Sequence, residues 1–352
     1  MFTSFLGLRA WPVLGIVNGF FVGLLISVFS VAGFADEAGP KIAVGVIGVD
    51  TPHATDFTRI MNNPKATGPL ADCTVVAAYL GGSPDVPKSV DLRAKQGKLI
   101  REMGVEVVDS IELLLGKVDA VMLETLDGRP HLKEAKKVIA AKKPLFIDKP
   151  LAGSLADCVE IFKLAEAAGT PCFSSSSLRF SKGVAAIRSG NNPKIGKVIG
   201  SAAYGPNKLL VPHRMPDLFY YGIHGAETLF SIMGPGCKTV RRIKAGNADL
   251  VVGVWKNGRL GTYRSYGGFG ATIYGTKGVA LGGKWTGYDP LVVEIARFFR
   301  TGRPPVSHEE TLEIYTFLEA ADESKRHGGA PVSMESVLDK ARNQVSAKSQ
   351  YR

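Results

Sequence analysis

Cysteine is scarce in this sequence, and no two cysteines form a C-x-x-C pair. Each of the four stands in or beside an apolar segment, where a buried free thiol is the common outcome. They are Cys73, Cys158, Cys172 and Cys237. We therefore expect neither a disulfide framework nor a metal site.

Runs of five or more basic residues are also missing, although the formal net charge is +11. A nucleic-acid groove favours clustered lysine and arginine with aromatic residues between them. We expect no nucleic-acid partner. The positive charge favours anions such as phosphorylated cofactors, acidic sugars or a membrane surface, or it is simply a solvated basic surface.

The first 35 residues differ from the rest of the chain. Arg9 precedes a long apolar segment that ends in Gly33-Phe34-Ala35, with small residues where signal peptidase prefers them. We expect cleavage of residues 1–35 and export to the periplasm or the extracellular space. The alternative is a membrane anchor over residues 11–34, because the segment exceeds the usual h-region of about 7 to 15 residues. Membrane contact is expected only if this segment is retained.

Short apolar runs alternate with helical stretches between residues 36 and 175. Such runs suit strands buried on both faces, and helices between them imply right-handed crossovers and a parallel sheet. The expected strands are Ile42–Ile47, Thr74–Leu80, Val105–Val108, Ala120–Leu123, Leu145–Ile147 and Pro171–Ser174. We predict an α/β Rossmann domain, with a doubly wound parallel sheet, over residues 36–175.

The pattern changes after residue 176. Closely spaced strand-like segments are joined by Asn-Gly and glycine turns, and strands linked in this way pair antiparallel. We predict an α+β domain with a large, mainly antiparallel, open-faced sheet over residues 176–335, followed by a tail over residues 336–352. The open sheet offers a face for a homo-oligomer.

The loop after the first expected strand departs from the G-x-G-x-x-G of dinucleotide-binding folds. It reads Gly48-Val49-Asp50-Thr51-Pro52-His53. A helix that starts after Gly48 would point its N–H groups at a pyrophosphate. Asp50 or Thr51 would cap the same N–H groups in a plain strand-to-helix turn. The loop alone leaves both interpretations open.

A second candidate is the turn Asp148-Lys149-Pro150, which follows an expected strand. Lys149 would then emerge at the carboxyl edge of the sheet, where ligands of open α/β folds bind. The alternative is a solvated lysine at a strand end. The proline after it favours the functional interpretation, because it stiffens the turn.

The stretch from Asp119 to Phe180 closely resembles the Gfo/Idh/MocA oxidoreductases, whose E-K-P motif appears here as Asp148-Lys149-Pro150. The segment YYGIHGAETLF resembles the second motif of that family, D-x-G-x-H-x-x-D, with the histidine at His224 and the last acid at Glu227. The likeness extends over residues 41–332. It covers most of the chain after the first 35 residues.

The resemblance implies NAD or NADP in the cleft between two domains and hydride transfer at a carbon of a sugar or cyclitol. Lys149 or His224 would carry the proton, because oxidising an alcohol needs a base within hydrogen-bond reach of the hydroxyl. Tyr220 stands where the family has an acid, four residues before the histidine. Lys149, His224 and Tyr220 are therefore the candidate catalytic residues. Without the resemblance, His224 is an ordinary histidine on an amphipathic helix.

The candidate cofactor-binding residues follow from the same resemblance. They are Gly48, Asp50, Thr51, His53, Ser83, Glu124, Asp148 and Lys149. No acid directly follows Leu80 to accept the ribose hydroxyls of NAD, and a serine at position 83 would suit a 2′-phosphate. This difference favours NADP weakly over NAD.

Three functions remain open from the sequence. The first is an exported oxidoreductase that uses NAD(P) on a carbohydrate. The second is a glycoside-cleaving enzyme of the same fold that uses bound NAD transiently. The third is a sugar-binding protein that has kept the cleft and lost the cofactor.

Overall fold

The computed structural model describes residues 41–350, with gaps at 191–192, 212–213 and 247. The expected signal peptide and the alternative anchor lie outside the described residues. Among the helices that are described, none has both the length and the apolar character needed to span a bilayer.

The first sheet confirms the predicted Rossmann domain. Its strands pair in parallel, in the order β3-β2-β1-β4-β5-β6. Their bounds are β1 (Ile42–Ile47), β2 (Cys73–Tyr79), β3 (Glu106–Val108), β4 (Ala120–Leu123), β5 (Leu145–Ile147) and β6 (Cys172–Ser174). The strand order reverses between β1 and β4, so the crevice at their carboxyl ends is the switch point where ligands of such sheets bind.

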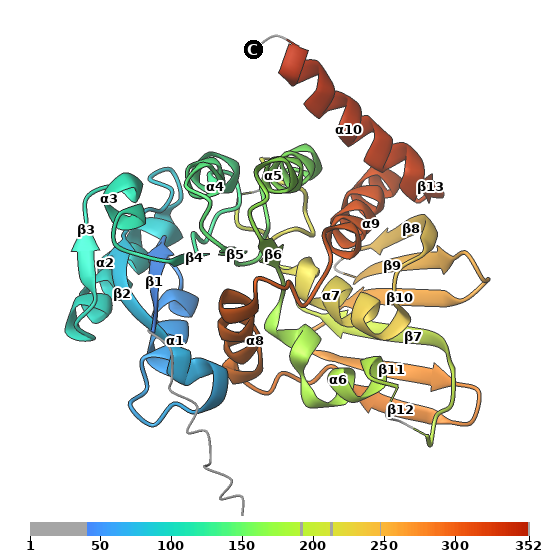
Figure 1. Cartoon of the computed structure of the whole chain (residues 1–352). Helices are drawn as coiled ribbons and strands as arrows, with labels where there is room; N and C mark the ends of the chain where they lie inside the picture. Colours follow the sequence, from blue (N-terminus) through green and yellow to red (C-terminus); the bar gives the residue numbers. More distant parts are fainter. Residues whose placement is uncertain (1–40, 191–192, 212–213, 247, 351–352) are drawn as a thin grey trace, which may run out of the picture. The chain divides into compact units, whose positions relative to one another are not determined.

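Helices cover both faces of this sheet (Figure 1). They are α1 (Pro52–Met61), α2 (Pro87–Glu102), α3 (Ile111–Leu115), α4 (His131–Ala140) and α5 (Leu155–Ala168), with a 3-10 turn η1 (Gly68–Asp72). Helix α5 shows how local signals set their ends. Its Ser154 side chain accepts a hydrogen bond from Asp157 N, and Gly169 ends it with a φ of 63°.

The second sheet runs in the order β12-β11-β7-β10-β9-β8-β13 and confirms the predicted α+β part. Its strands are β7 (Val198–Gly205), β8 (Cys237–Ala245), β9 (Ala248–Trp255), β10 (Leu260–Ser265), β11 (Gly270–Gly275), β12 (Val279–Gly282) and β13 (Val332–Ser333). Strands β7 and β10 pair in parallel, and the other pairs are antiparallel.

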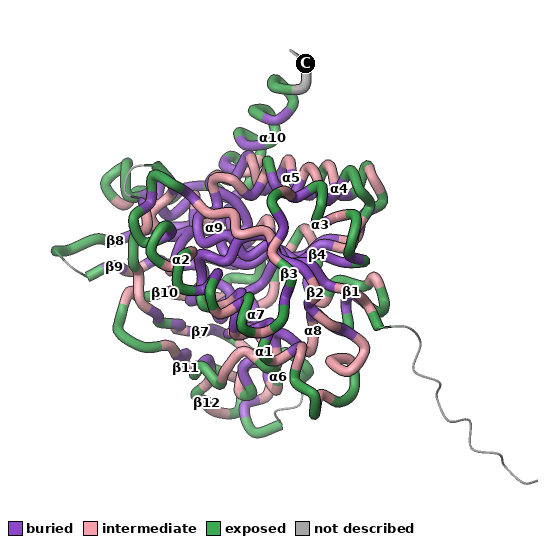
Figure 2. The backbone as a smooth tube through the Cα atoms, turned by 90° about the vertical axis from the view of Figure 1, so that its left-hand side faces the viewer, coloured by how far each residue is buried: buried purple, intermediate pink, exposed green. Residues whose placement is uncertain are grey.

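One face of the second sheet carries helices, with α7 against β7 and β10 and α9 against β8 (Figure 1). These helices are α6 (Lys182–Arg188), α7 (Gly222–Met233) and α9 (His308–Arg326), with a 3-10 turn η2 (Ser177–Phe180) before them. Helix α7 is buried along its whole length. Figure 2 shows the same concentration of buried backbone along the strands of both sheets.

Packing crosses the sequence boundary between the two domains. Helix α8 (Asp289–Thr301) comes late in the chain, yet its apolar side chains share a core with β1, α1 and β5. Phe298, for example, lies edge-on to Phe173 at the end of the Rossmann sheet. The segment expected as a tail forms helix α10 (Met334–Gln350), which buries Val337 and Val345.

Candidate active site

Three site residues directly follow strands of the Rossmann sheet. Gly48 follows β1, Glu124 follows β4 and Asp148 follows β5. Because these neighbouring strands are parallel, the three residues meet at one edge of the sheet. The switch point is therefore lined by two acids, both less than 4% exposed.

Lys149 emerges at this edge, as the sequence predicts. Its peptide bond to Pro150 is cis. The ammonium nitrogen lies 5.3 Å from the centre of the Tyr220 ring and 5.5 Å from that of Tyr221. Among the described residues it has no ion-pair partner. Lys149 is thus a nearly buried cation held by aromatic faces and not by a carboxylate.

Two further lysines gather at the same pair of tyrosines. Lys88 Nζ donates a hydrogen bond of 3.0 Å to the Tyr220 hydroxyl, and Lys208 Nζ lies 5.2 Å from the centre of the Tyr221 ring. Burial raises the pKa of Tyr220 to about 12, so its hydroxyl stays protonated at neutral pH. The sequence analysis missed Lys88 and Lys208, because neither belongs to a recognisable motif.

His224 lies on α7 and contacts the ring of Tyr221 edge-on. Its ring centre is 5.4 Å from that of Tyr221, and its Nδ1 is 2.7 Å from Ser176 Oγ. Burial, followed by the charge of Lys149, holds the pKa of His224 well below its ordinary value. The imidazole is therefore neutral at pH 7, which is the state that a general base requires.

The partner of His224 differs from the family pattern. Tyr220 stands in the place of the family acid, but it contacts the lysines, and Ser176 Oγ makes the hydrogen bond to the imidazole. Ser176 comes from the run of serines after β6, where no pattern singled it out. Lys149 and His224 both border the Tyr221 ring, so the two predicted proton carriers meet from separate domains.

The loop after β1 resolves the ambiguity of the sequence. Thr51 is the N-cap of α1 and accepts a hydrogen bond from His53 N, while Pro52 in the first turn has no N–H to offer. Gly48 has a φ of 84°, and a Cβ there would lie 2.4 Å from Thr125 Oγ1. The turn therefore demands glycine because β1 and β4 end so close together.

Asp50 fills the position of the second glycine of the G-x-G-x-x-G pattern. Its buried carboxylate accepts hydrogen bonds from Leu126 N at 3.0 Å and from Ser89 Oγ at 2.5 Å. It thereby ties the loop after β1 to the loop after β4 and to α2. A buried negative charge thus lies beneath the loop at the position where the family pattern has a glycine.

Ser83 does not point into open space for a 2′-phosphate. Its hydroxyl donates to Asp127 Oδ2 at 2.8 Å, and its backbone N–H donates to Ser89 Oγ. Asp127 also pairs with Arg129. The side chain that favoured NADP is therefore buried within a network of the protein's own groups.

His53 fills the position of the third glycine. Its Nδ1 lies 2.7 Å from Asp148 Oδ2, and its ring stacks on Phe57 with centres 5.2 Å apart. Burial alone would raise the pKa of Asp148, but His53 and Lys149 together hold it below the ordinary value. Asp148 is therefore a carboxylate at neutral pH.

These observations divide the site into two ends. The end that holds Lys149, His224 and Tyr221 fits a nicotinamide ring beside a hydroxyl-bearing substrate, since both candidate proton carriers lie within 5.5 Å of the centre of the Tyr221 ring. The end that holds Asp50 does not fit the usual phosphate cradle, because the first turn of α1 has its donors capped or missing. A dinucleotide would have to place its phosphates against side chains instead.

The last acid of the second family motif, Glu227, serves the fold. Its carboxylate accepts a hydrogen bond from Arg179 Nε at 2.6 Å, and both groups are buried. Arg179 also pairs with Glu310 on α9. This network connects η2, α7 and α9 behind the site.

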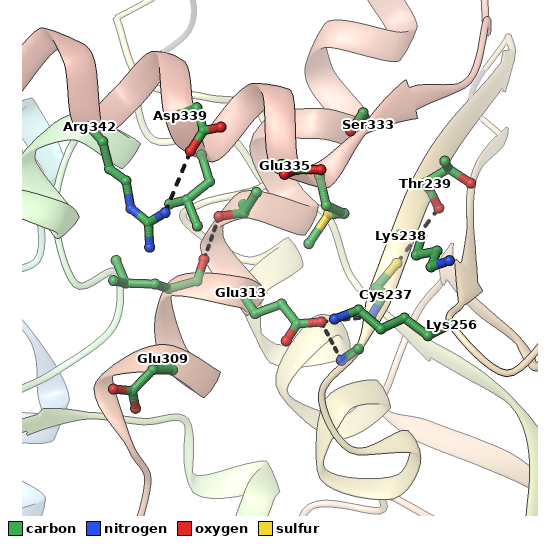
Figure 3. A pocket seen from close by; sticks show the side chains of 15 residues that line it. Cys237, Lys238, Thr239, Lys256, Glu309, Glu313, Ser333, Glu335, Asp339 and Arg342 are labelled. Carbon is green, nitrogen blue, oxygen red and sulfur yellow. Dashed lines mark hydrogen bonds and ion pairs between the residues drawn. The ribbon is translucent and has the colours of Figure 1, made fainter.

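A hollow of about 680 Å³ lies elsewhere, between α9, α10 and β8 (Figure 3). The carboxylate of Glu313 accepts hydrogen bonds from the backbone N–H groups of Gly236 and Cys237 there. Arg342 and Asp339 pair with each other along α10. Glu313 thus ties α9 to the start of β8, and the Arg342–Asp339 pair lies within α10, so these polar groups have structural partners. We locate the functional site at the edge of the Rossmann sheet.

Comparison with known proteins identifies the Rossmann part of the chain. Residues 42–175 match the family model GFO_IDH_MocA, described as an oxidoreductase family with an NAD-binding Rossmann fold. No curated protein sequence matches the chain.

Solved structures of the same fold cover most of the chain. A probable dehydrogenase from Thermotoga maritima has a TM-score of 0.68 at 19% identity and covers 84% of this chain and 100% of its own. A myo-inositol dehydrogenase from Lactobacillus casei, in complex with NAD(H) and myo-inositol, has a TM-score of 0.66 at 15% identity and covers 83% and 96%. Residues 42–175 therefore match the NAD-binding Rossmann domain of the Gfo/Idh/MocA oxidoreductases, and the described structure shares the fold of these solved dehydrogenases.

Proposed function

We propose that the protein is an NAD(P)-dependent oxidoreductase that acts on a carbinol carbon of a sugar or cyclitol. The observation that carries this proposal is the meeting of Lys149 and His224 at the Tyr221 ring. The solved neighbours with bound inositols and NAD(H) support the substrate class.

The chain's own residues supply the proton chemistry. Lys149 donates a hydrogen bond to the substrate hydroxyl and stabilises the negative charge that develops on its oxygen. His224, neutral at pH 7, accepts the hydroxyl proton at Nε2 while its Nδ1–H donates to Ser176 Oγ. NAD(P)⁺, when bound, supplies the hydride acceptor.

Substrate binding draws on the two tyrosines and their lysines. Sugar C–H faces pack on aromatic rings, and Tyr220 and Tyr221 lie at 5.1 Å from each other. Lys88 and Lys208 add positive charge beside Lys149. We propose that these ammonium groups also meet the cofactor phosphates that the loop after β1 does not cradle.

Purified protein tests the proposal through its nicotinamide content and its turnover. Acid extraction followed by an enzymatic assay measures bound NAD(H) and NADP(H) separately. Initial rates with a panel of polyols and uronates then report reduction of added NAD⁺ or NADP⁺. Absence of both binding and reduction would overturn the oxidoreductase proposal and leave a sugar-binding role.

The glycoside-cleaving alternative has its own readout. It predicts release of the leaving group from aryl glycosides without net formation of reduced cofactor. The same protein sample serves both assays, so the two enzyme classes separate in one experiment.

The open face of the second sheet supports a homo-oligomer. Large apolar side chains on this face are exposed, among them Ile199, Leu260, Val279 and Leu281. An exposed apolar sheet face marks an interaction surface. We propose that two copies pair there; light scattering on wild type and Leu281→Glu tests this, with a smaller mass expected for the variant.

Export remains a proposal that rests on residues 1–35. It predicts a mature N-terminus at Asp36, which mass spectrometry of protein from the periplasmic fraction would detect. A chain that keeps residues 11–34 in the membrane fraction would favour the anchor instead.

A further inference from the structure

The floor of the crevice contains a polar group that the redox chemistry does not use. Glu124 follows β4 and is 0% exposed, and neither of its carboxylate oxygens has a hydrogen-bond partner among the described residues. Buried carboxylates without partners are rare and costly in native proteins. A buried carboxylate of this kind needs a bound ligand or a nearby positive charge to offset the cost of its burial.

Two further potential ligands lie beside Glu124. The metal-ligating atoms of His53, Glu124 and Asp148 are all within 4.8 Å of one another. They come from three separate elements, namely α1 and the ends of β4 and β5. From this arrangement we propose that His53, Glu124 and Asp148 bind a divalent transition-metal ion beneath the reacting centre.

The geometry suits one ion. Nitrogen and oxygen ligands sit about 2.0–2.2 Å from Zn²⁺, so two ligands of one ion are at most about 4.4 Å apart. In the tetrahedral geometry usual for Zn²⁺, ligand atoms are about 3.4 Å apart, so the most widely spaced pair would have to approach by up to about 1.4 Å. One imidazole with two carboxylates favours Zn²⁺ or Mn²⁺ over Mg²⁺, which prefers oxygen ligands and retains water.

The charge balance points the same way. Two carboxylates buried side by side repel each other when both are ionised, and a divalent cation bound between them removes that repulsion. Lys149 offsets this charge only in part: its ammonium group acts on both carboxylates through space, but it lies over the tyrosine rings and forms no ion pair with Glu124 or Asp148 in the described structure.

The enclosure of Glu124 favours an ion over a larger ligand. Glu124 has no exposed surface in this structure, so an ion fits beside its carboxylate more readily than a nicotinamide or a sugar hydroxyl. His53 is more open, with 14% of its side chain exposed, and offers a way in. The ion would thus remain bound at the edge of the sheet, where one of its ligands, Asp148, directly precedes Lys149.

Metal content and binding test the proposal on the full chain. Elemental analysis of protein purified without chelator should find about one zinc or manganese per chain. After chelator treatment, calorimetric titration with ZnCl₂ and MnCl₂ should show one site, with MgCl₂ much weaker. Protein that holds no metal and shows no saturable site would overturn the proposal.

Glu124→Gln keeps the shape of the side chain and removes its charge, and we expect it to weaken metal binding by about 100-fold or more. Glu134→Gln is the matched control, because Glu134 is also buried but pairs with Thr125 Oγ1 outside the cluster. Its affinity should stay within about twofold of wild type. Equal affinities of wild type and Glu124→Gln would overturn the proposal.

His53→Asn provides a second variant if Glu124→Gln does not fold, and circular dichroism decides which one is used. These titrations contain neither nicotinamide nor substrate. Metal binding without nicotinamide binding would therefore sink the proposed function alone. Nicotinamide-dependent turnover in protein without a metal site would sink this inference alone.

Discussion

The ammonium group of Lys149 lies over the ring of Tyr220, with 5.3 Å between the nitrogen and the ring centre. An aromatic face attracts a cation by about 0.5–2 kcal/mol without neutralising it. Lys149 therefore keeps its full charge at the crevice, available to a negatively charged oxygen of the substrate. A carboxylate in place of the Tyr220 ring would have formed an ion pair with the ammonium group and neutralised its charge.

Lys149→Met should reduce turnover by about 100-fold or more while leaving the melting temperature within a few degrees of wild type. Methionine keeps the apolar stem and removes a nearly buried ammonium that has no ion pair, so stability has little to lose. Initial rates and a thermal melt measure the two effects. Lys95→Met, at an exposed position on α2, is the control and should change neither. Joint loss of folding and activity would make Lys149 a structural residue.

His224→Asn should change how stability depends on pH. The folded pKa of His224 is depressed by burial and by Lys149, so the unfolded chain takes up a proton that the folded protein does not. Stability is therefore full above the ordinary histidine pKa of about 6.5 and falls as the pH drops below it. Melting temperatures between about pH 7.5 and pH 5 should fall less steeply in the variant.

The same variant should lower kcat by about 100-fold, the contribution typical of a general base. Ser176→Ala, which removes the partner of Nδ1, should cause a smaller loss of kcat. A change confined to KM in His224→Asn would assign this residue to substrate positioning. A pH profile of kcat that is the same in wild type and variant would also argue against a base at position 224.

Strand and helix positions could be predicted from the sequence because they rest on local signals. The apolar runs of β1, β4 and β5 match the structure residue for residue. The ends of α5 follow equally local signals, a serine cap at Ser154 and a glycine at Gly169.

The hydrogen bonds and packing contacts within the site could not be predicted, because they join residues far apart in the chain. Ser176 meets His224, and Lys88 meets Tyr220, across separations of 48 and 132 residues. The pairing of α8 with the Rossmann core is of the same kind. The family motif pointed to Lys149 and His224, whereas their partners emerge only from packing.

Glu227→Gln tests whether Glu227, the last acid of the second family motif, has a structural or a catalytic role. It leaves the buried Arg179 with one partner fewer, and breaking a buried ion pair costs about 3–5 kcal/mol. Urea unfolding should show a loss of this order. Turnover of the folded fraction should stay near wild type, and Glu102→Gln, at an exposed position on α2, should leave the unfolding midpoint in place. A selective fall in kcat would contradict the structural role.

Asp50→Asn tests whether the loop after β1 limits cofactor binding. The amide keeps one acceptor for Leu126 N or Ser89 Oγ and removes the negative charge that a pyrophosphate would face. We expect tighter binding of NADH by a few-fold or more, measured by fluorescence titration, at a cost of about 1–2 kcal/mol in the free energy of unfolding. Asp91→Asn, which changes an exposed acid on α2, controls for net charge and should leave the affinity unchanged. Weaker NADH binding in Asp50→Asn would contradict this expectation. It would show that the carboxylate itself holds the cofactor, for example through a ribose hydroxyl. Asp50 would then have the role that the acid after the second strand plays in other Rossmann folds.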